Sequence, residues 1–303
     1  MVTQTTGLPP RRDPVASVRL YTHNIYARRA NWERRREVLA DGIAALDPDV
    51  ILFQEEVLTA SADQTAERVG PGRHLVHSQA RSSEERSGIS IASRWPVTAV
   101  HEIDLTIGGP PIDEYAWAAL IVQIDGPPAV GRFVVANHFP DAAVDREYER
   151  ERQAVMVTRR IRELADANDL PVVLAGDLDA EPDAASLRFL TGRQSLNGLG
   201  EAYVRAWEVV HPGEPCWTLD PVNALHDAQL PGWPYQQIDH ILVRCNRAGT
   251  TSFRVDACER VHSSPRNGVW ASDHFGLVAD LSMIKPDLDG SRRAAADRAA
   301  GPR

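Results

Sequence analysis

The segment Pro171–Pro182 places two aspartates directly after a short apolar run. It reads Pro-Val-Val-Leu-Ala-Gly-Asp177-Leu-Asp179-Ala-Glu-Pro, and its apolar part is typical of a buried strand. Residues two apart in an extended segment point to the same side, so Asp177 and Asp179 can converge on one point beyond the strand, where ligands bind in open α/β sheets. Asp and Gly also form turns, so a simple turn is the alternative for this segment taken alone.

Further polar residues lie at the end of an apolar run or just beside one. They are Asn24, Glu55, His138, Asp239, Asp273 and His274. Each by itself could be a cap or a turn residue. Together with the two aspartates, their oxygens suit a hard cation such as Mg²⁺, Mn²⁺ or Ca²⁺, and the histidines lack the paired spacing of a zinc protease.

The composition is that of an ordinary globular protein. The chain has 303 residues, of which 43% are hydrophobic and 25% charged, enough to bury a sizeable core. Its net charge of −9 gives no global basic field, which weakens a nucleic-acid partner without excluding one. A metal site and a local groove can still bind phosphate within an acidic protein.

The cysteines and the N-terminus bear on the cellular location. Cys216, Cys245 and Cys258 are odd in number and show no C-x-x-C spacing, which predicts neither a disulfide framework nor a structural zinc site. The N-terminus lacks the apolar core of a signal peptide, and no run approaches the roughly 18 apolar residues of a membrane span. These features predict a cytoplasmic protein with no membrane partner.

The first part of the chain predicts a parallel pair of strands with a crossover helix. Ser17–Ile25 alternates as a half-buried strand and delivers Asn24 at its end. Asn31–Leu46 has apolar residues at helical spacing, with Asn31 as the expected N-cap. Val50–Glu56 is a second apolar run that ends in carboxylates. A strand, a helix and a strand in this order are compatible with parallel pairing.

The rest of the chain predicts short antiparallel strands and a few helices. The expected strands are Arg73–Gln79, Gly88–Ser93, Val97–Ile107, Tyr115–Ile124, Phe133–His138, Gln237–Arg244, Ser252–Glu259 and Ala271–Leu281. Asp145–Asp166 predicts a long amphipathic helix with a solvated charged face, and Asp183–Leu190 a short helix capped by Asp183. Residues 191–235 are expected to be irregular. Residues 16–283 are expected to form a single domain, between a mobile segment 1–15 and a polar tail 284–303.

Several of these stretches resemble the endonuclease/exonuclease/phosphatase superfamily, which is deoxyribonuclease-I-like and metal-dependent. The matching stretches are Tyr-Thr-His-Asn24, Leu-Phe-Gln-Glu55, Gly-Ile-Ser-Ile-Ala-Ser (88–93), Val-Ala-Asn-His138, Leu-Ala-Gly-Asp177-Leu-Asp179, Gln-Ile-Asp239-His-Ile and Ser-Asp273-His274. Their order and spacing over residues 17–282 carry the resemblance. It implies an α/β fold, a four-layer sandwich of two mixed β-sheets flanked by helices.

The resemblance also implies a role for each site residue. Glu55 corresponds to the principal metal ligand, with Asn24 beside it and Asp273 on the same metal face. The implied catalytic residues are His274 at the phosphate, Asp239 orienting it, His138 contacting the phosphate and Asp177 positioning or deprotonating the attacking water. The physical logic agrees, because a divalent cation and an imidazolium neutralise the charge that builds up on a phosphate ester. The expected cofactor is Mg²⁺ or Mn²⁺.

Asp179 departs from the family motif, which is Gly-Asp-x-Asn. Asparagine donates a hydrogen bond to a phosphate oxygen, whereas ionised aspartate only accepts. Three solutions are open: a second cation held by Asp177, Asp179 and His138; a neighbouring arginine or a protonated His138; or a protonated Asp179. We favour the second cation, since paired metals about 4 Å apart hold the attacking and leaving oxygens of a phosphate.

The sequence predicts a metal-dependent phosphoric ester hydrolase that acts on a small organic phosphate mono- or diester. The first alternative is a nuclease acting on DNA or RNA, and the second is a non-catalytic binding module on the same fold. No basic, aromatic-interleaved stretch favours bulk nucleic acid. The aromatic residues of the irregular segment are Trp207, Trp217, Trp233 and Tyr235. They either shape a pocket for the substrate or pack the segment against the core.

Overall fold

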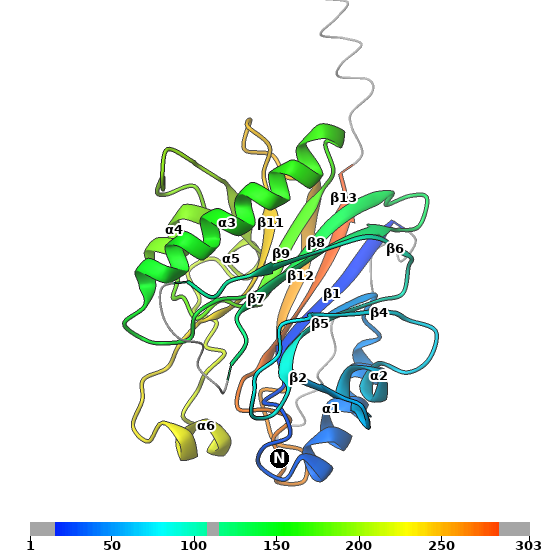
Figure 1. Cartoon of the computed structure of the whole chain (residues 1–303), viewed down its shortest axis with the longest axis vertical. Helices are drawn as coiled ribbons and strands as arrows, with labels where there is room; N and C mark the ends of the chain where they lie inside the picture. The colour runs from blue at the N-terminus through cyan, green and yellow to red at the C-terminus, as the bar shows by residue number, and fades with distance from the viewer. Residues whose placement is uncertain (1–15, 108–114, 285–303) are drawn as a thin grey trace, which may run out of the picture.

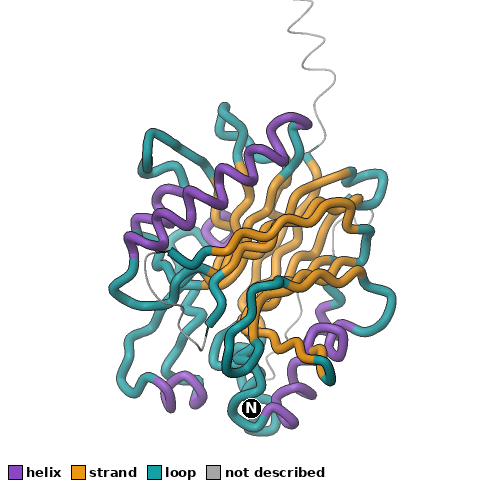
Figure 2. Tube along the Cα trace, in the orientation of Figure 1, coloured by secondary structure: helices purple, strands orange, loops and turns teal. Residues whose placement is uncertain are grey.

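The computed structural model describes residues 16–107 and 115–284. Within these residues the strands form two sheets that lie face to face, with helices on the outer faces (Figures 1 and 2). The predicted mobile segment 1–15 lies outside the described residues, as does the predicted tail apart from Ile284. The boundaries of the expected single domain therefore stay a prediction.

The first sheet has seven strands in the described part of the chain. In spatial order they are β12 (Phe253–Val261), β13 (Gly276–Met283), β1 (Ser17–Asn24), β2 (Val50–Thr59), β5 (Ser87–Ser93) and β4 (His74–His77), and β3 (Ala62–Asp63) pairs with β2. β1 and β2 are parallel, and the helix α1 (Trp32–Leu46) connects them, which confirms the predicted crossover. The other pairs are antiparallel.

The second sheet has six described strands. In spatial order they are β10 (Tyr203–Arg205), β11 (Asp239–Arg244), β9 (Val172–Asp177), β8 (Arg132–Phe139), β7 (Ala118–Asp125) and β6 (Val97–Asp104). β8 and β9 are parallel, joined through the long helix α3 (Glu147–Ala165) and the short 3₁₀ turn η1 (Asp166–Asn168). The remaining pairs are antiparallel, so both sheets are mixed, as predicted.

Side-chain alternation in the strands creates three apolar layers. In β9, Val173 and Ala175 join the core between the sheets, whereas Val172 and Leu174 pack toward the outer helices. α3 covers this outer face together with α4 (Ala185–Leu190), and α1 and α2 (Gln64–Val69) cover the other sheet. Each fully buried Val or Leu stabilises the fold by about 1.5–3 kcal/mol. The resulting helix-sheet-sheet-helix stack confirms the predicted four-layer sandwich.

Neither Asn31 nor Asp183 caps its helix with a side-chain hydrogen bond as predicted, although both helices are present where the pattern places them. Asn31 precedes α1 but has a φ of 58°, in the left-handed region, and its side chain makes no capping bond. An N-cap residue normally has extended backbone so that its side chain can reach back to the helix. α4 begins at Ala185 after Ala184, so Asp183 is not the N-cap residue.

Residues 191–235 contain more regular structure than expected. Besides β10, they include the helices α5 (Ala206–Val210) and α6 (Ala224–Gln229). These short elements follow Gly- and Pro-containing stretches, which hide helical periodicity in so few residues. No helix in the described part of the chain is long and apolar enough to span a membrane.

Candidate active site

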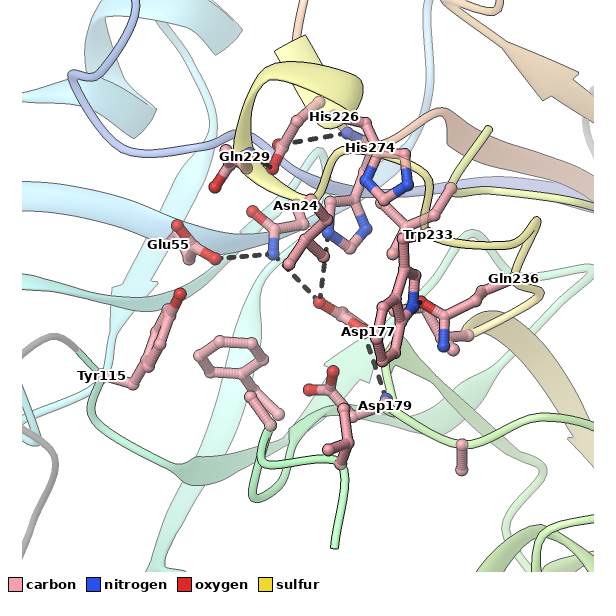
Figure 3. A pocket seen from close by; sticks show the side chains of 18 of the residues that line it. Asn24, Glu55, Tyr115, Asp177, Asp179, His226, Gln229, Trp233, Gln236 and His274 are labelled. Carbon is pink, nitrogen blue, oxygen red and sulfur yellow. Dashed lines mark hydrogen bonds and ion pairs between the residues drawn. The ribbon is translucent and has the colours of Figure 1, made fainter. Parts of the chain in front are cut away.

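The strand ends of both sheets deliver the predicted site residues to one edge of the sandwich. Asn24 ends β1 and Asp177 ends β9, while Asp239 starts β11 directly opposite Asp177 in the antiparallel pair. These residues lie in or beside a pocket of about 530 Å³ (Figure 3). The two sheets therefore bring together residues that are more than 200 positions apart in the sequence.

Glu55 reaches the pocket through a break in strand pairing. β2 continues to Thr59, so the prediction that this strand ends at the glutamates is wrong. The register of β2 against β5 shifts between Phe53 and Glu56, and Glu55 has a φ of 54°. Left-handed backbone in a residue other than glycine is strained and is concentrated at functional sites. The bulge gives Glu55 a direction that regular alternation would not.

Asn24 connects the two sheets at the base of the pocket. Its Nδ2 donates to Glu55 Oε1 at 2.9 Å and to Asp177 Oδ2 at 3.0 Å. Its Oδ1 accepts from the backbone N–H of Tyr26 at 3.1 Å. In this arrangement the amide orients two carboxylates, and the role of Asn24 as a metal ligand stays a prediction.

Asp273 and Glu55 are the carboxylates of the predicted metal face. Burial raises the pKa of Glu55 to about 7, and the nearby charge of Asp273 adds to that rise. In the described part of the chain, no arginine or histidine forms an ion pair with Glu55, Asp273 or Asp179. Buried carboxylates without a cationic partner are costly, and oxygen donors of this kind suit Mg²⁺ or Mn²⁺. The donor set therefore fits the expected cation.

His274 forms the predicted pair with Asp239. Its Nδ1 lies 3.0 Å from Asp239 Oδ2, and its Nε2 lies 3.9 Å from Asp177 Oδ2. Burial lowers the pKa of His274, but the charges of Asp239 and Asp177 outweigh it and hold the pKa well above its usual value. The ring is thus held in one orientation and favoured as the imidazolium. Atoms of these three residues also lie within 4.8 Å of one another, a spacing that a metal could use.

Asp179 faces the same pocket with little to neutralise it. It has a φ of 47°, its N–H donates to Asp177 Oδ1 at 3.3 Å, and its Oδ2 is buried with no hydrogen-bond partner among the described residues. Burial and the charge of Asp177 raise the pKa of Asp179 well above its usual value, and burial together with Asp239 raises that of Asp177 to about 6. Figure 3 shows Asp179 beside Asp177 at the pocket.

The structure does not bring His138 to the pocket lining. Asn137 points between the sheets and donates to the carbonyls of Phe53 and Ser90, so alternation turns the next side chain toward the α3 layer. His138 is buried, and this burial lowers its pKa to about 3, which disfavours an imidazolium. Its predicted contact with a substrate phosphate stays a prediction.

The pocket lining combines charged and polar side chains with aromatic and apolar ones. The larger aromatic and apolar residues are Tyr26, Tyr115, Phe139, Val144, Leu219, Leu230, Trp233 and Ile238. Trp233 stands beside Asp177 in Figure 3, and its Nε1 donates to Gln236 Oε1 at 2.8 Å. The ring centroids of Trp217 and Tyr235 lie 4.5 Å apart with the planes tilted by 37°, and those of Trp207 and His211 lie 4.1 Å apart. Only Trp233 of the four predicted aromatic residues lines the pocket.

Sequence reasoning missed several polar residues of the pocket, among them Arg150, His226 and Gln229. Arg150 was expected on a solvated helix face, but it is buried and bonds Glu147 at 2.7 Å together with two loop carbonyls. His226 and Gln229 belong to α6, which was expected to be irregular. The signal that could have found α6 is Asn223 followed by a short run without Gly or Pro.

Comparison with known proteins identifies the fold and the family. The model of the Endonuclease/Exonuclease/phosphatase family matches residues 21–274. One similar solved structure is D. rerio TDP2 complexed with single strand DNA product, with a TM-score of 0.67 and 18% identity over 88% of this chain and 100% of that chain. Another is the human Nocturnin catalytic domain with bound sulfate anion, with a TM-score of 0.67 and 17% identity over 89% of this chain and 95% of that chain. An endonuclease/exonuclease/phosphatase from Bacteroides vulgatus is also similar, with a TM-score of 0.65 and 17% identity over 88% of this chain and 99% of that chain.

No curated protein sequence matches the chain. At these identities the solved structures establish the fold, and the family model, which spans most of the chain, establishes the family. The resemblance inferred from the sequence motifs is thereby confirmed. The chain belongs to the endonuclease/exonuclease/phosphatase family of metal-dependent phosphoester hydrolases.

Proposed function

We propose that the chain hydrolyses a small organic phosphate mono- or diester with the help of Mg²⁺ or Mn²⁺. The observation that carries this proposal is the pair of buried carboxylates Glu55 and Asp273, which have no ion-pair partner in the part of the chain that the structure describes and line the same pocket as His274. Such a cluster is stable only when a cation binds or when protons neutralise it. The neighbouring histidine supplies the second positive charge that a phosphate requires.

Each side chain then has a role in the reaction. Glu55 and Asp273 would hold the cation, with Asn24 fixing Glu55 and Asp177 relative to each other. When bound, the cation stabilises negative charge that develops on the phosphoryl oxygens. His274 donates a hydrogen bond to the phosphate through Nε2, because Asp239 occupies its Nδ1. Asp177 accepts a proton from the attacking water and orients it in line with the leaving group.

The pocket favours a substrate with one phosphate and an apolar organic part. The two arginines of the lining are already engaged: Arg29 pairs with Glu85 at 3.2 Å, and Arg150 with Glu147. A polyanion gains little from cations that already have partners. Trp233 and Tyr115 instead offer aromatic surfaces for an organic group.

A nuclease activity is the second candidate. It is supported by the similar structure of TDP2 complexed with single strand DNA product, since a single strand can place its bases on aromatic side chains. The non-catalytic alternative has less support, because the carboxylates and the His274–Asp239 pair are all present in one pocket. The cytoplasmic location stays a prediction.

A substrate screen tests the proposal. Purified protein with Mg²⁺ or Mn²⁺ is assayed against aryl and alkyl phosphate mono- and diesters, and in parallel against plasmid DNA and DNA and RNA oligonucleotides. We expect metal-dependent turnover of small esters, and its loss both in excess chelator and in Glu55→Gln. Turnover of oligonucleotides alone would select the nuclease, and full activity in excess chelator would overturn the metal-dependent mechanism.

A further inference from the structure

Asn223 links the start of α6 to the backbone of the candidate metal ligand. Its side chain is fully buried, and its Nδ2 donates to the carbonyl oxygens of Ser272 at 2.8 Å and Asp273 at 2.9 Å. Its Oδ1 accepts from the N–H of Leu225 at 3.1 Å, which makes Asn223 the N-cap of α6. One amide therefore fixes a helix start and the Asp273 backbone at the same time.

Gln229, at the other end of α6, holds the carboxylate of Asp273. Its Nε2 donates to Asp273 Oδ2 at 2.7 Å. The other oxygen, Oδ1, accepts from Ser272 Oγ at 3.0 Å and from the His274 N–H at 3.1 Å. Both carboxylate oxygens of Asp273 thus have donors, and Gln229 is the donor that comes from outside the Ser272–His274 segment.

α6 cannot supply this geometry by its own stability. It has six residues, and isolated helices shorter than about 12 residues are marginal in water. Its position therefore depends on its contacts, among which the bonds of Asn223 to the segment before β13 are buried. The same segment of the chain carries Leu230 and Trp233 into the pocket wall. The chain from Asn223 to Trp233 therefore both bonds Asp273 and lines the pocket.

We propose that Asn223 and Gln229 are positioning residues for Asp273, which place its carboxylate for the cation and keep His274 at the phosphate. This inference rests on the proposed function, because it assumes that Asp273 is a metal ligand. Side chains that orient metal ligands typically contribute about 10–100-fold to metal affinity. Both side chains bond the Ser272–Asp273 segment, so their effect on the cation runs through Asp273.

Asn223→Asp separates this role from helix capping. Aspartate caps a helix as well as asparagine does, so the bond to the Leu225 N–H remains. It has no N–H to donate, however, and would direct a carboxylate oxygen at two carbonyls. Gln229→Met is the matching change at the other end, since it keeps the length of the side chain and removes the donor. Gln123→Ala is the control, because the Gln123 amide bonds Thr98 and does not line the pocket.

Calorimetric titration with Mn²⁺ provides the first measurement. We expect Asn223→Asp and Gln229→Met to bind Mn²⁺ about 10–100-fold more weakly than the wild type, and Gln123→Ala to bind it as the wild type does. Wild-type affinity in both variants would overturn the inference. If Asn223→Asp does not fold, the result for Gln229→Met decides.

Hydrogen exchange in the metal-free protein provides the second measurement. The His274 amide donates to Asp273 Oδ1, so we expect it to exchange faster in both variants than in the wild type. Unchanged exchange would overturn the positioning role. If the wild type itself binds no Mn²⁺, the proposed function fails, whereas faster exchange in the variants would still support the positioning of Asp273.

Discussion

Glu55 and Glu56 are neighbours in the sequence and both are buried, yet their surroundings differ. Glu56 forms an ion pair with Arg81 at 2.6 Å and a second with His77 at 3.1 Å. Asp63 lies 3.2 Å from the other nitrogen of His77, which completes a charge-balanced cluster. Glu55, across the strand bulge, has the neutral amide of Asn24 as its one hydrogen-bond donor within residues 16–107 and 115–284. Glu56 is therefore a buried carboxylate with cationic partners, whereas Glu55 has none among the described residues.

This difference supports the proposal that the cation binds at Glu55 and not at Glu56. Atoms of Glu56, Asp63 and His77 also have a spacing that a metal could use, but Arg81 already supplies positive charge there. The cluster around Glu55 and Asp273 has no such partner among the described residues, and burial raises the pKa of Glu55. A buried carboxylate without a cationic partner destabilises the fold, and a bound cation at Glu55, as proposed, would neutralise it.

Replacing each glutamate by glutamine should have opposite effects on activity and stability. Glu55→Gln should lower turnover by about 10³-fold, since a metal supplies several kcal/mol of charge stabilisation, and should leave the stability of the metal-free protein unchanged or higher. Glu56→Gln should cost about 3 kcal/mol of unfolding free energy, because it leaves Arg81 without its charged partner. Steady-state kinetics and urea unfolding measure the two effects, and equal loss of stability in both variants would contradict the distinction.

The His274–Asp239 pair should behave as a unit. His274→Ala and Asp239→Asn should each lower turnover by about 10²–10⁴-fold, because a positioned acid or base typically contributes that much. The double variant should be little worse than the more severe single one, since residues that act together are not additive. Kinetic constants for the four proteins form the test, and losses that multiply would show that the two residues act independently.

Asp179→Asn changes the charge next to Asp177. It restores the family motif, removes one unneutralised charge beside Asp177 and provides a donor for a phosphate oxygen. We expect a change of about tenfold in the preference among phosphoesters, comparable to one hydrogen bond to a charged group. Turnover should also depend less on a second equivalent of metal. Identical metal titrations of activity in the two proteins would argue against a second cation held by Asp179.

The pH dependence of stability tests the role of His77 in the cluster of Glu56, Asp63, His77 and Arg81. Burial lowers its pKa, but the hydrogen bond and charge of Glu56 and the charge of Asp63 outweigh it, so the pKa is raised in the folded state. A raised pKa contributes stability that is complete below the unfolded value of about 6.5 and is lost as the pH rises through the folded value.

His77→Gln should therefore destabilise the protein more at acidic than at alkaline pH. Urea unfolding of the variant and the wild type at about pH 5.5 and about pH 9 measures the difference. This is the smallest effect expected here, because the His77 side chain is partly exposed. A destabilisation that is equal at both pH values would show that His77 contributes packing and not charge.

The fold could be predicted from the polar residues that directly follow apolar runs in the sequence. Asn24 and Asp177 follow apolar runs, and a strand that leaves a buried sheet delivers its next polar residue to the sheet edge. The alternation of Val172 to Ala175 fits a strand covered on both faces, which a four-layer sandwich requires. Free cysteines, as predicted, are present at Cys216, Cys245 and Cys258.

What could not be predicted depends on pairing between distant segments. Alternation does not reveal the register shift that turns Glu55 into the pocket, because the shift exists only against β5. Alternation also does not tell which face of β8 packs against the other sheet. His138 is therefore predicted at the pocket, but it is the side chain of Asn137 that points between the sheets. Gln229 was missed because its function arises from a bond to Asp273, 44 residues away.

Anomalous scattering from crystals soaked in Mn²⁺ would show where the cation binds. We predict a strong peak within bonding distance of the Glu55 and Asp273 carboxylates, and none at Glu56, Asp63 and His77. A second peak beside Asp179 would establish the second cation, and its absence at saturating Mn²⁺ would exclude it without affecting the first site. No peak at Glu55, or a peak at the Glu56 cluster alone, would contradict the account.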